Sequence, residues 1–376
     1  METVWRIAVP VPLYTLFDYL PVPGASTPTP GCRVRVPFGR HSRIGCLLEV
    51  VEGSAIDHAR LKTATAVLDN SPLLRPEDLA LLKWAARYYH HPPGEVLAAA
   101  LPGLLRRGRS ADAGSPQFLA LTENGLMLAL DTLSRAPRQA LLLRALRDAA
   151  GHRLAAADLS AAMPGWRRAA EALVARRLAE FGGTLQTVPA ACAPLAWSGL
   201  DARLNPAQVQ AVDRVARSFG QHATFLLEGV TGSGKTEVYL NLVRLAAARG
   251  EQTLLLLPEI SLTPQIEERF RAGLDGAIGV FHSRLTESER LQSWLGAQRG
   301  TARVLLGTRS AVFVPLRRPG LIVVDEEHDP SYKQQEGFRF SARDVAIKRA
   351  HELGIPIVLG SATPCLESLW NAQRGR

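Results

Sequence analysis

The sequence is poor in cysteine and has no long hydrophobic run. Its 376 residues include four cysteines, which are scattered along the chain without any C-x-x-C pair. Such cysteines support neither a zinc site nor a disulfide framework. No apolar stretch is long enough to span a membrane, and the first residues lack the apolar core of a signal peptide. We therefore expect a cytoplasmic chain with no zinc site and no membrane partner.

Acidic residues are also in the minority. The chain carries 44 lysines and arginines against 35 aspartates and glutamates, which gives a net charge of +9. This excess favours a polyanionic partner such as nucleic acid or an anionic membrane surface. Most of the basic residues are arginines, so a generally basic surface is the alternative interpretation. A chain of this length is expected to hold two or three domains.

The first part of the chain, residues 1–105, is predicted to be a β-rich domain with a trailing helix. Short alternating apolar runs predict strands over Arg33–Pro37 and Ile44–Val51, in a small barrel or compact sheet. Apolar residues at helical spacing after a proline predict the helix over 76–90. Residues 102–116 are rich in Gly, Arg, Ser and Ala and are predicted to be a linker.

The middle of the chain, residues 106–198, is predicted to be a winged-helix domain. Helical patterns cover 137–149, 155–162 and 166–180, and a β-like stretch follows over Thr184–Val188. The helices carry many arginines, which suits a surface that faces DNA. An ordinary helical bundle with solvated basic faces is the alternative.

From residue 199 onward the pattern is α/β, and we predict one domain over 199–376. Nearly continuous Val, Ile and Leu runs are typical of strands buried on both faces of a parallel sheet. The expected fold class is therefore multidomain α/β, with a small β-rich amino-terminal domain, a winged helix and a doubly wound parallel sheet. The predicted strands of that sheet lie at 224–230, 253–258, 277–281, 303–306, 321–325 and 355–359.

Residues 229–236 form a complete G-x-x-x-x-G-K-[ST] phosphate-binding loop. The loop lies between an apolar strand and an amphipathic helix, which is the context that this motif requires. Backbone N–H groups of the loop and the helix N-terminus would surround the phosphates. Lys235 is expected to reach the β- and γ-phosphates, and Thr236 to offer its hydroxyl to Mg²⁺. The expected nucleotide contacts are Gly229, Val230, Thr231, Gly232, Ser233, Gly234, Lys235 and Thr236.

A second group of candidate residues follows the apolar strand that begins at Leu321. Asp325 stands where this strand emerges, which is the usual place for the acid that holds Mg²⁺. Glu326 would then orient or deprotonate the attacking water. A polar cap on a buried strand is the alternative interpretation.

Three further segments suit phosphate or nucleic-acid contacts. Gly360–Pro364 and Gly307–Ser310 place small hydroxyl residues at the carboxyl ends of strands, where ligands bind in such sheets. Residues 331–343 interleave aromatic and basic side chains, which suits single-stranded bases and backbone. A loop whose aromatic rings pack on the sheet is the alternative. The expected DNA contacts of these segments are Thr308, Arg309, Tyr332, Lys333, Phe338, Phe340 and Arg343.

Together these motifs resemble the first, RecA-like motor lobe of superfamily 2 helicases. Other segments of the sequence resemble one family within this superfamily. The segments Leu257–Gln265, Asp325–Gly337 and Ala342–Val345 resemble the PriA family, the bacterial primosomal proteins N′ that restart replication. Phe17–Leu20 and Gly31–Gly39 resemble the same family's domain for the 3′ end of a nascent strand. The resemblance covers essentially the whole chain.

This resemblance implies an ATP-dependent 3′→5′ DNA helicase that recognises stalled or abandoned replication forks and initiates primosome assembly. The implied cofactors are ATP and Mg²⁺. The implied partners are forked DNA, single-stranded DNA, the single-stranded-DNA-binding protein and other primosome proteins, and the chain is expected to be a monomer.

The resemblance also implies roles for single residues. Gln208 would read the adenine edge, and the aromatic loop would couple DNA binding to hydrolysis. His328 would link the nucleotide site to the coupling motif formed by Ser361, Ala362 and Thr363. A carboxylate such as Asp18 suits a terminal 3′-hydroxyl, because that hydroxyl is a hydrogen-bond donor. The implied 3′-end pocket is formed by Phe17, Asp18, Gly39 and Lys62.

PriA-like proteins continue into a second motor lobe, a cysteine-rich zinc-binding insertion and a C-terminal domain, whereas this sequence stops at Arg376. Zinc is therefore expected only in that further part, and the chain is expected to be a fragment or a truncated product. Two functions stay open: the amino-terminal half of a helicase, or a fork- and nucleotide-binding module that does not unwind DNA. A small-molecule P-loop kinase or transporter ATPase would leave the basic winged helix and the aromatic loop unexplained.

Overall fold

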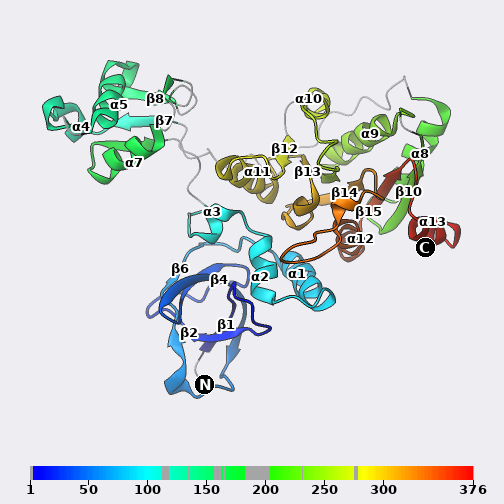
Figure 1. Cartoon of the computed structure of the whole chain (residues 1–376), viewed down its shortest axis with the longest axis horizontal. Coiled ribbons are helices and arrows are strands. Elements are labelled where there is room, and N and C mark those ends of the chain that lie inside the picture. Colours follow the sequence, from blue (N-terminus) through cyan, green and yellow to red (C-terminus); the bar gives the residue numbers. More distant parts are fainter. Residues whose placement is uncertain are drawn as a thin grey trace. The chain divides into compact units, whose positions relative to one another are not determined.

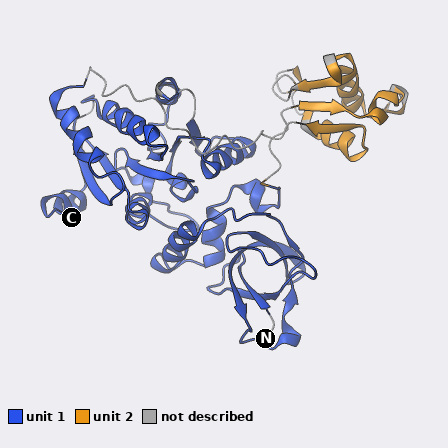
Figure 2. Ribbon diagram, turned by 180° about the vertical axis from the view of Figure 1, so that it is seen from behind, with its two compact units in different colours: residues 1–110, 189–376 blue, residues 111–188 orange. Residues whose placement is uncertain are grey.

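Residues 1–110 and 189–376 form one unit of the computed structural model, and residues 111–188 form a second (Figure 2). The segment predicted as the winged helix, 106–198, includes the whole of the second unit. The structure describes residues 3–111, 118–133, 136–155, 159, 162–163, 166–182, 204–230, 232–274 and 278–375.

Alternating apolar residues at the amino terminus build a six-stranded sheet with the strand order β5-β2-β1-β4-β3-β6. Trp5, Ile7, Val34 and Val36 are fully buried on its inner face, as expected for a sheet with one face toward a core. The sheet curls round on itself (Figure 1). Both predicted strands are confirmed, as β3 and β4. The strands are β1 (Thr3–Ala8), β2 (Phe17–Leu20), β3 (Arg33–Phe38), β4 (His41–Glu52), β5 (Lys62–Thr63) and β6 (Ala66–Val67).

Three helices follow this sheet: α1 (Pro76–Tyr88), α2 (Pro93–Ala99) and α3 (Gly103–Arg106). Pro76 stands in the first turn of α1, and the carboxylate of Asp78 accepts a hydrogen bond from the backbone N–H of Arg75 at 3.0 Å. The predicted linker over 102–116 is corrected at its start, because α3 forms there and buries Leu105.

The second unit is a three-stranded antiparallel sheet covered by helices (Figure 2). The predicted helix 137–149 is confirmed as α5, whereas helix 166–180 ends early. The left-handed backbone of Arg177 (φ 56°) breaks the helix, and the following residues join the sheet. Most of the predicted helix 155–162 and all of Thr184–Val188 lie outside the described residues. The elements are β7 (Phe118–Leu121), α4 (Glu123–Met127), α5 (Pro137–Asp148), β8 (Arg153–Ala155), α7 (Trp166–Ala175) and β9 (Ala179–Gly182).

All six predicted strands of the α/β part are confirmed and form a parallel sheet in the order β10-β15-β14-β11-β13-β12. Its central strands are buried along nearly their whole length, because helices cover both faces. The strands are β10 (Ala223–Glu228), β11 (Gln252–Leu256), β12 (Ile278–Phe281), β13 (Val304–Gly307), β14 (Pro319–Val324) and β15 (Pro356–Ser361). The helices are α8 (Pro206–Ala216), α9 (Lys235–Ala248), α10 (Pro264–Gly273), α11 (Glu287–Arg299), α12 (Ala342–Leu353) and α13 (Leu366–Gln373). No described helix is both long and apolar enough to cross a membrane.

Polar contacts join the amino-terminal helices to this α/β lobe. The buried guanidinium of Arg349 on α12 donates to the carbonyl of Val312 at 2.7 Å and lies 3.7 Å from the carboxylate of Asp78 on α1. The indole N–H of Trp294 on α11 donates to the carbonyl of Ala100 at 2.9 Å. Figure 1 shows α1 beside α12 and α3 beside α11. The β-rich domain and the lobe therefore share one packed interface.

Arg33 holds the amino-terminal domain together from its centre. Its guanidinium and its backbone N–H both donate to the carboxylate of Asp69, with the shortest ion-pair distance at 2.6 Å. Its remaining nitrogen donates to the carbonyls of Leu105 and Arg109 at the end of α3. Arg33 and Asp69 are almost completely buried, so neither charge can be solvated if the other is lost.

We predict that Asp69→Asn destabilises this domain by about 3–5 kcal/mol, because the guanidinium of Arg33 is left buried without an opposite charge. Urea unfolding compares this variant with Glu52→Gln, which removes a carboxylate from an exposed position of the same sheet and is expected to change stability by no more than about 0.5 kcal/mol. Equal unfolding of the two variants would contradict the role given to the pair.

Candidate functional site

The phosphate-binding loop joins β10 to the N-terminus of α9. Gly232 and Gly234 both have positive φ, at 81° and 84°, which a residue with a side chain rarely adopts. A Cβ on Gly229 would lie 2.6 Å from the hydroxyl of Ser233, so the loop also lacks room there. Gly234 caps the helix and Lys235 begins it. The free N–H groups of the first turn therefore point into the loop, where they form an anion site.

Lys235 points back into this loop toward the carboxylates. Its ammonium donates to the carbonyl of Gly229 at 2.8 Å and lies 3.3 Å from a carboxylate oxygen of Glu326. Thr236 follows at the second helical position and Val230 is exposed, whereas Thr231 lies outside the described residues. The structure thus brings the loop lysine and the acidic end of β14 together.

Asp325 directly follows β14 and its side chain is partly buried beside the loop. Burial raises its pKa, and a hydrogen bond from the hydroxyl of Tyr239 at 2.8 Å partly offsets this increase. A Cβ on Gly360 would overlap that hydroxyl and lie 3.3 Å from Asp325. The glycine of the Gly-Ser-Ala-Thr motif is therefore required to make room for the pair of Tyr239 and Asp325.

Glu326 lies at the centre of a chain of polar contacts. Its backbone is left-handed (φ 45°), a strained conformation for a residue with a side chain. One carboxylate oxygen lies near Lys235, and the other accepts from the backbone N–H of Ala362 at 3.4 Å. His328 lies 2.7 Å from the hydroxyl of Ser361 through one ring nitrogen and 3.3 Å from that of Thr363 through the other. The residues of the predicted coupling motif therefore contact the nucleotide side of the sheet directly.

Gln208 lies beside the phosphate loop although it comes from the preceding helix, α8. Its amide N–H donates to the carbonyl of Ser233 at 3.0 Å, and its amide oxygen accepts from the backbone N–H of Asn205. The structure therefore places this residue beside the phosphate loop, and its contact with adenine stays a prediction.

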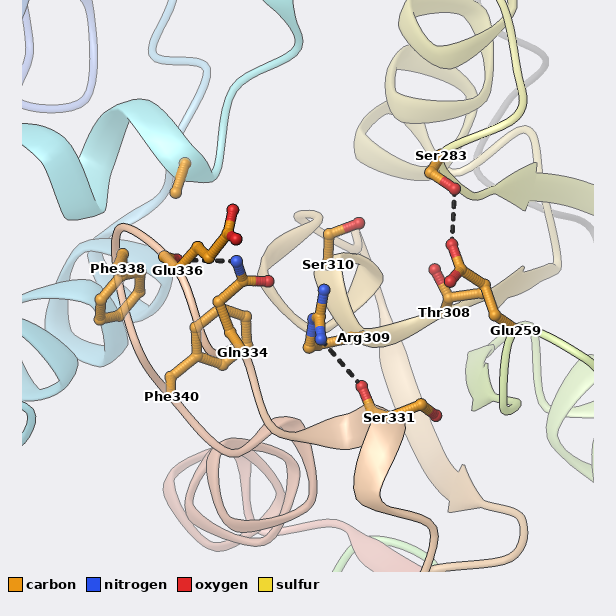
Figure 3. A pocket seen from close by; sticks show the side chains of 11 residues that line it. Glu259, Ser283, Thr308, Arg309, Ser310, Ser331, Gln334, Glu336, Phe338 and Phe340 are labelled. Carbon is orange, nitrogen blue, oxygen red and sulfur yellow. Dashed lines mark hydrogen bonds between the residues drawn. The ribbon is translucent and has the colours of Figure 1, made fainter.

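A pocket of about 260 Å³ opens at the carboxyl ends of β12 and β13 (Figure 3). Thr308 and Arg309 line it from one side, and residues of the loop over 331–343 line it from the other. Arg309 donates to the carbonyls of Ser331 and Lys333 at 3.1 and 2.9 Å. In this structure Arg309 therefore holds the loop against the sheet.

The aromatic rings of the loop are buried, which corrects the expectation that they are free to stack on bases. Tyr332 is 2% exposed, and Phe338 and Phe340 are each 8% exposed. Phe338 packs against Phe340, Phe313, Tyr89 and His91, with ring centroids 4.9 to 6.1 Å apart. The packing alternative that the sequence left open is the one that the structure shows, because these apolar rings fill the junction between α1 and the lobe.

Arg343 is likewise engaged inside the protein, which corrects its assignment as a free DNA contact. Its guanidinium pairs with Glu327 at 3.0 Å and with Asp344 at 2.9 Å. Burial alone would raise the pKa of Glu327, but hydrogen bonds from Cys365, Arg343 and Ser368 together lower it. Lys333 stays exposed and is the loop residue of the predicted set that solvent reaches freely.

The structure brings together two parts of the predicted 3′-end pocket, Phe17 and the turn that contains Gly39. Phe17 packs edge to face on Phe38 at 5.1 Å, and Phe38 directly precedes Gly39 in an exposed turn. Lys62 pairs with Tyr19 of β2.

Asp18 lies on the opposite face of β2 from its neighbour Phe17, because successive strand residues alternate. Its carboxylate accepts from the guanidinium of Arg6 at 3.1 Å and from the hydroxyl of Ser54 at 2.7 Å. The structure therefore gives Asp18 two partners that the sequence did not predict.

Known proteins match both parts of this arrangement. Residues 6–102 match the PriA 3′ DNA-binding domain (3′BD), and residues 205–369 match the DEAD/DEAH box helicase family. The replication restart protein PriA of Haemophilus influenzae is 39% identical over 99% of this chain and 50% of that protein. PriA of Chlamydia trachomatis is 34% identical over 95% of this chain and 48% of that protein. The chain corresponds to the amino-terminal portion of PriA.

The chain spans about half the length of these two PriA relatives. The helicase domain shared with PriA implies the use of ATP and Mg²⁺, and the 3′BD implies DNA binding.

Sequence reasoning missed two residues that shape the nucleotide site of this PriA portion. Tyr239 stands one helical turn after Lys235, and that spacing alone would have placed it beside the loop. Glu327 is the third acid after β14, and its buried hydrogen bonds to residues near Cys365 had no sequence signal. Both residues support neighbouring groups and do not face the phosphate loop themselves.

We predict that Tyr239→Phe shifts Mg²⁺-dependent nucleotide binding toward higher pH. The pKa of Asp325 is already raised by burial, and removal of the Tyr239 hydroxyl raises it further. A metal ligand must be deprotonated, so binding is lost earlier as pH falls. Titration with a fluorescent nucleotide across acid pH measures the shift. Tyr332→Phe is the matched control, because its hydroxyl donates to the backbone carbonyl of Asp325 and not to the carboxylate; identical profiles for both variants would contradict the prediction.

Proposed function

We propose that this chain binds DNA 3′ ends and ATP as part of a 3′→5′ helicase that restarts replication at abandoned forks. One observation carries the proposal. A phosphate-binding loop and a pair of carboxylates meet at one edge of a parallel sheet, within the same packed unit as a 3′ DNA-binding domain. Because the chain spans about half of its relatives, we assign unwinding to the whole protein and the two binding sites to this portion.

The residues at the phosphate-binding loop fit a nucleoside triphosphate with Mg²⁺. Three features of the loop together suit phosphate oxygens. Two of its glycine positions leave no room for a Cβ, α9 begins at the loop, and the ammonium of Lys235 lies inside it. We propose that Thr236 and Asp325 hold the metal ion, which would neutralise phosphate charge when bound. Gln208, beside the same loop, is proposed to contact the adenine.

Glu326 and His328 are proposed to act next to these groups. Glu326 presents its carboxylate beside the ammonium of Lys235, and we propose that it orients a water molecule and accepts its proton. His328 lies between Glu326 and the hydroxyls of Ser361 and Thr363. Through these contacts His328 would transmit a change at the nucleotide side to the end of β15.

DNA is proposed to contact this chain at two places. In the amino-terminal domain, Phe17, Asp18, Gly39 and Lys62 would hold the 3′ end. A carboxylate offers about four acceptor positions, so Asp18 can accept from a 3′-hydroxyl in addition to Arg6 and Ser54. On the lobe, Thr308 and Arg309 at the pocket of Figure 3 and the exposed Lys333 would follow the DNA backbone.

The proposed partners, oligomeric state and cellular location follow from similarity to the same PriA relatives. Forked DNA, single-stranded DNA, the single-stranded-DNA-binding protein and other primosome proteins are the partners that we propose, with the protein acting as a monomer in the cytoplasm. The zinc-binding region that PriA-like proteins contain is not among the residues proposed here.

We predict that Lys235→Ala weakens ATP binding at least tenfold and leaves DNA binding unchanged. The loop loses its ammonium, while the proposed DNA contacts lie elsewhere. Calorimetry measures ATP affinity, and fluorescence anisotropy measures affinity for a partial duplex. Lys348→Ala is the matched control, since Lys348 pairs with Glu352 on α12. If Lys235→Ala binds ATP as tightly as the control does, the nucleotide site is wrongly assigned.

A further inference from the structure

A basic pocket of about 480 Å³ lies between the amino-terminal sheet and α3. Strands β3 and β4 contribute Arg35 and Arg43, and α3 with its C-cap contributes Arg106 and Arg107. We call these four residues the arginine pocket. Among the described residues that line it, none is an aspartate or a glutamate. Its lining therefore carries several positive charges and no negative one.

Most of this charge is not neutralised by the protein. Arg107 pairs with Glu287 on α11, and the neighbouring Arg33 is neutralised by Asp69. Within the part of the chain that the structure describes, no carboxylate lies within ion-pair distance of the other three, Arg35, Arg43 and Arg106.

Arg35 adds a second observation. Its Nε atom is buried and has no hydrogen-bond partner among the described residues. A buried donor without an acceptor costs free energy, and clustered like charges repel one another. An anion with several acceptor oxygens in the pocket would accept from this donor and would reduce the repulsion among the arginines. Guanidinium groups bind phosphate oxygens well because two parallel N–H groups match their geometry.

The positive field extends to the adjacent helix α11. Burial, and after it the charge of Arg106, lower the pKa of Arg290 on that helix. Arg290 packs over the ring of Phe281, with 4.9 Å between its guanidinium carbon and the ring centroid. Glu287 on the same helix offsets part of this positive charge, because it pairs with Arg107 and interacts electrostatically with Arg106.

The pocket lies close to the residues proposed to hold the DNA 3′ end. Gly39 stands in the turn between β3 and β4, the same two strands that supply Arg35 and Arg43. Arg35 precedes Phe38 by three residues of β3, which corresponds to ~10 Å along the strand. In duplex DNA about three nucleotides of one strand cover that length.

We propose that the arginine pocket binds backbone phosphates of the DNA strand whose 3′ end is held near Gly39, about three nucleotides from that end. The inference rests on the proposed 3′-end recognition and adds the path of the strand that leads to it. Free polyphosphate shares the same chemistry, so the test separates the two sources.

The first measurement is the salt dependence of binding to a partial duplex with a recessed 3′-hydroxyl. The variant Arg43→Gln with Arg106→Gln removes two exposed pocket charges. The control, Arg214→Gln with Arg217→Gln, removes two exposed charges from the region of α8. We expect the slope of log K against log salt to become shallower by about 0.9 for each lost phosphate contact in the pocket variant only. Equal slopes for the two double variants would overturn the phosphate site.

A second measurement locates the contact. Uncharged methylphosphonate linkages replace single phosphates, one position at a time, starting from the 3′ end. The parent chain is expected to lose affinity when the replacement falls at about the third nucleotide, and the pocket variant is expected to lose none there. The same loss in parent and variant at every position would also overturn the site.

Two further binding measurements separate a failure of the pocket proposal from a failure of the proposed 3′-end recognition. Loss of inorganic pyrophosphate binding in the pocket variant, with an unchanged DNA salt slope, would show that the pocket takes free phosphates and that the proposal is wrong. Equal affinity of the parent for 3′-hydroxyl and 3′-phosphate ends would instead contradict the proposed 3′-end recognition. Unchanged ATP binding confirms that both double variants are folded.

Discussion

The loop over residues 331–343 is the connection on which the arrangement of this chain depends. At one end the hydroxyl of Tyr332 donates to the backbone carbonyl of Asp325 at 2.6 Å, next to the nucleotide site. At the other end Phe338 packs on Tyr89 and His91 of the amino-terminal domain. Arg309 holds the start of the loop against the sheet through the carbonyls of Ser331 and Lys333. The loop therefore contacts the backbone of Asp325 on one side and the amino-terminal domain on the other.

The chemistry beside the phosphate loop depends on the close packing of side chains at the carboxyl ends of the parallel strands. Asp325 is partly buried, hydrogen-bonded to Tyr239 and crowded by Gly360, whereas Glu326 is turned toward Lys235 by a left-handed backbone. Adjacent carboxylates thus receive different environments and different proposed roles. Metal coordination requires a deprotonated Asp325, which the hydrogen bond from Tyr239 favours and burial opposes, whereas the carboxylate of Glu326 beside Lys235 suits proton transfer.

Much of this arrangement follows from local sequence. The six strands of the parallel sheet, the phosphate loop and the acids after β14 are predictable because apolar runs and loop glycines obey short-range rules. Burial of the aromatic loop is not predictable in this way. Tyr332, Phe338 and Phe340 look like nucleic-acid contacts in sequence, but contacts between distant segments bury them. Tyr332 donates a hydrogen bond to the carbonyl of Asp325, Phe340 packs on Phe313, and Phe338 packs on Tyr89 at the end of α1. The partners of Asp18, Arg6 from β1 and Ser54 beyond β4, are hidden from sequence for the same reason.

The central claim is that the nucleotide site and the 3′ DNA-binding domain influence one another through this loop, and only a coupling measurement tests it. The most direct one is the affinity for a non-hydrolysable ATP analogue, with and without a saturating partial duplex that has a recessed 3′-hydroxyl. The account predicts that DNA changes the analogue's affinity by a factor of roughly 5 to 150, and that the analogue changes the DNA affinity by the same factor. Identical affinities with and without DNA would contradict it.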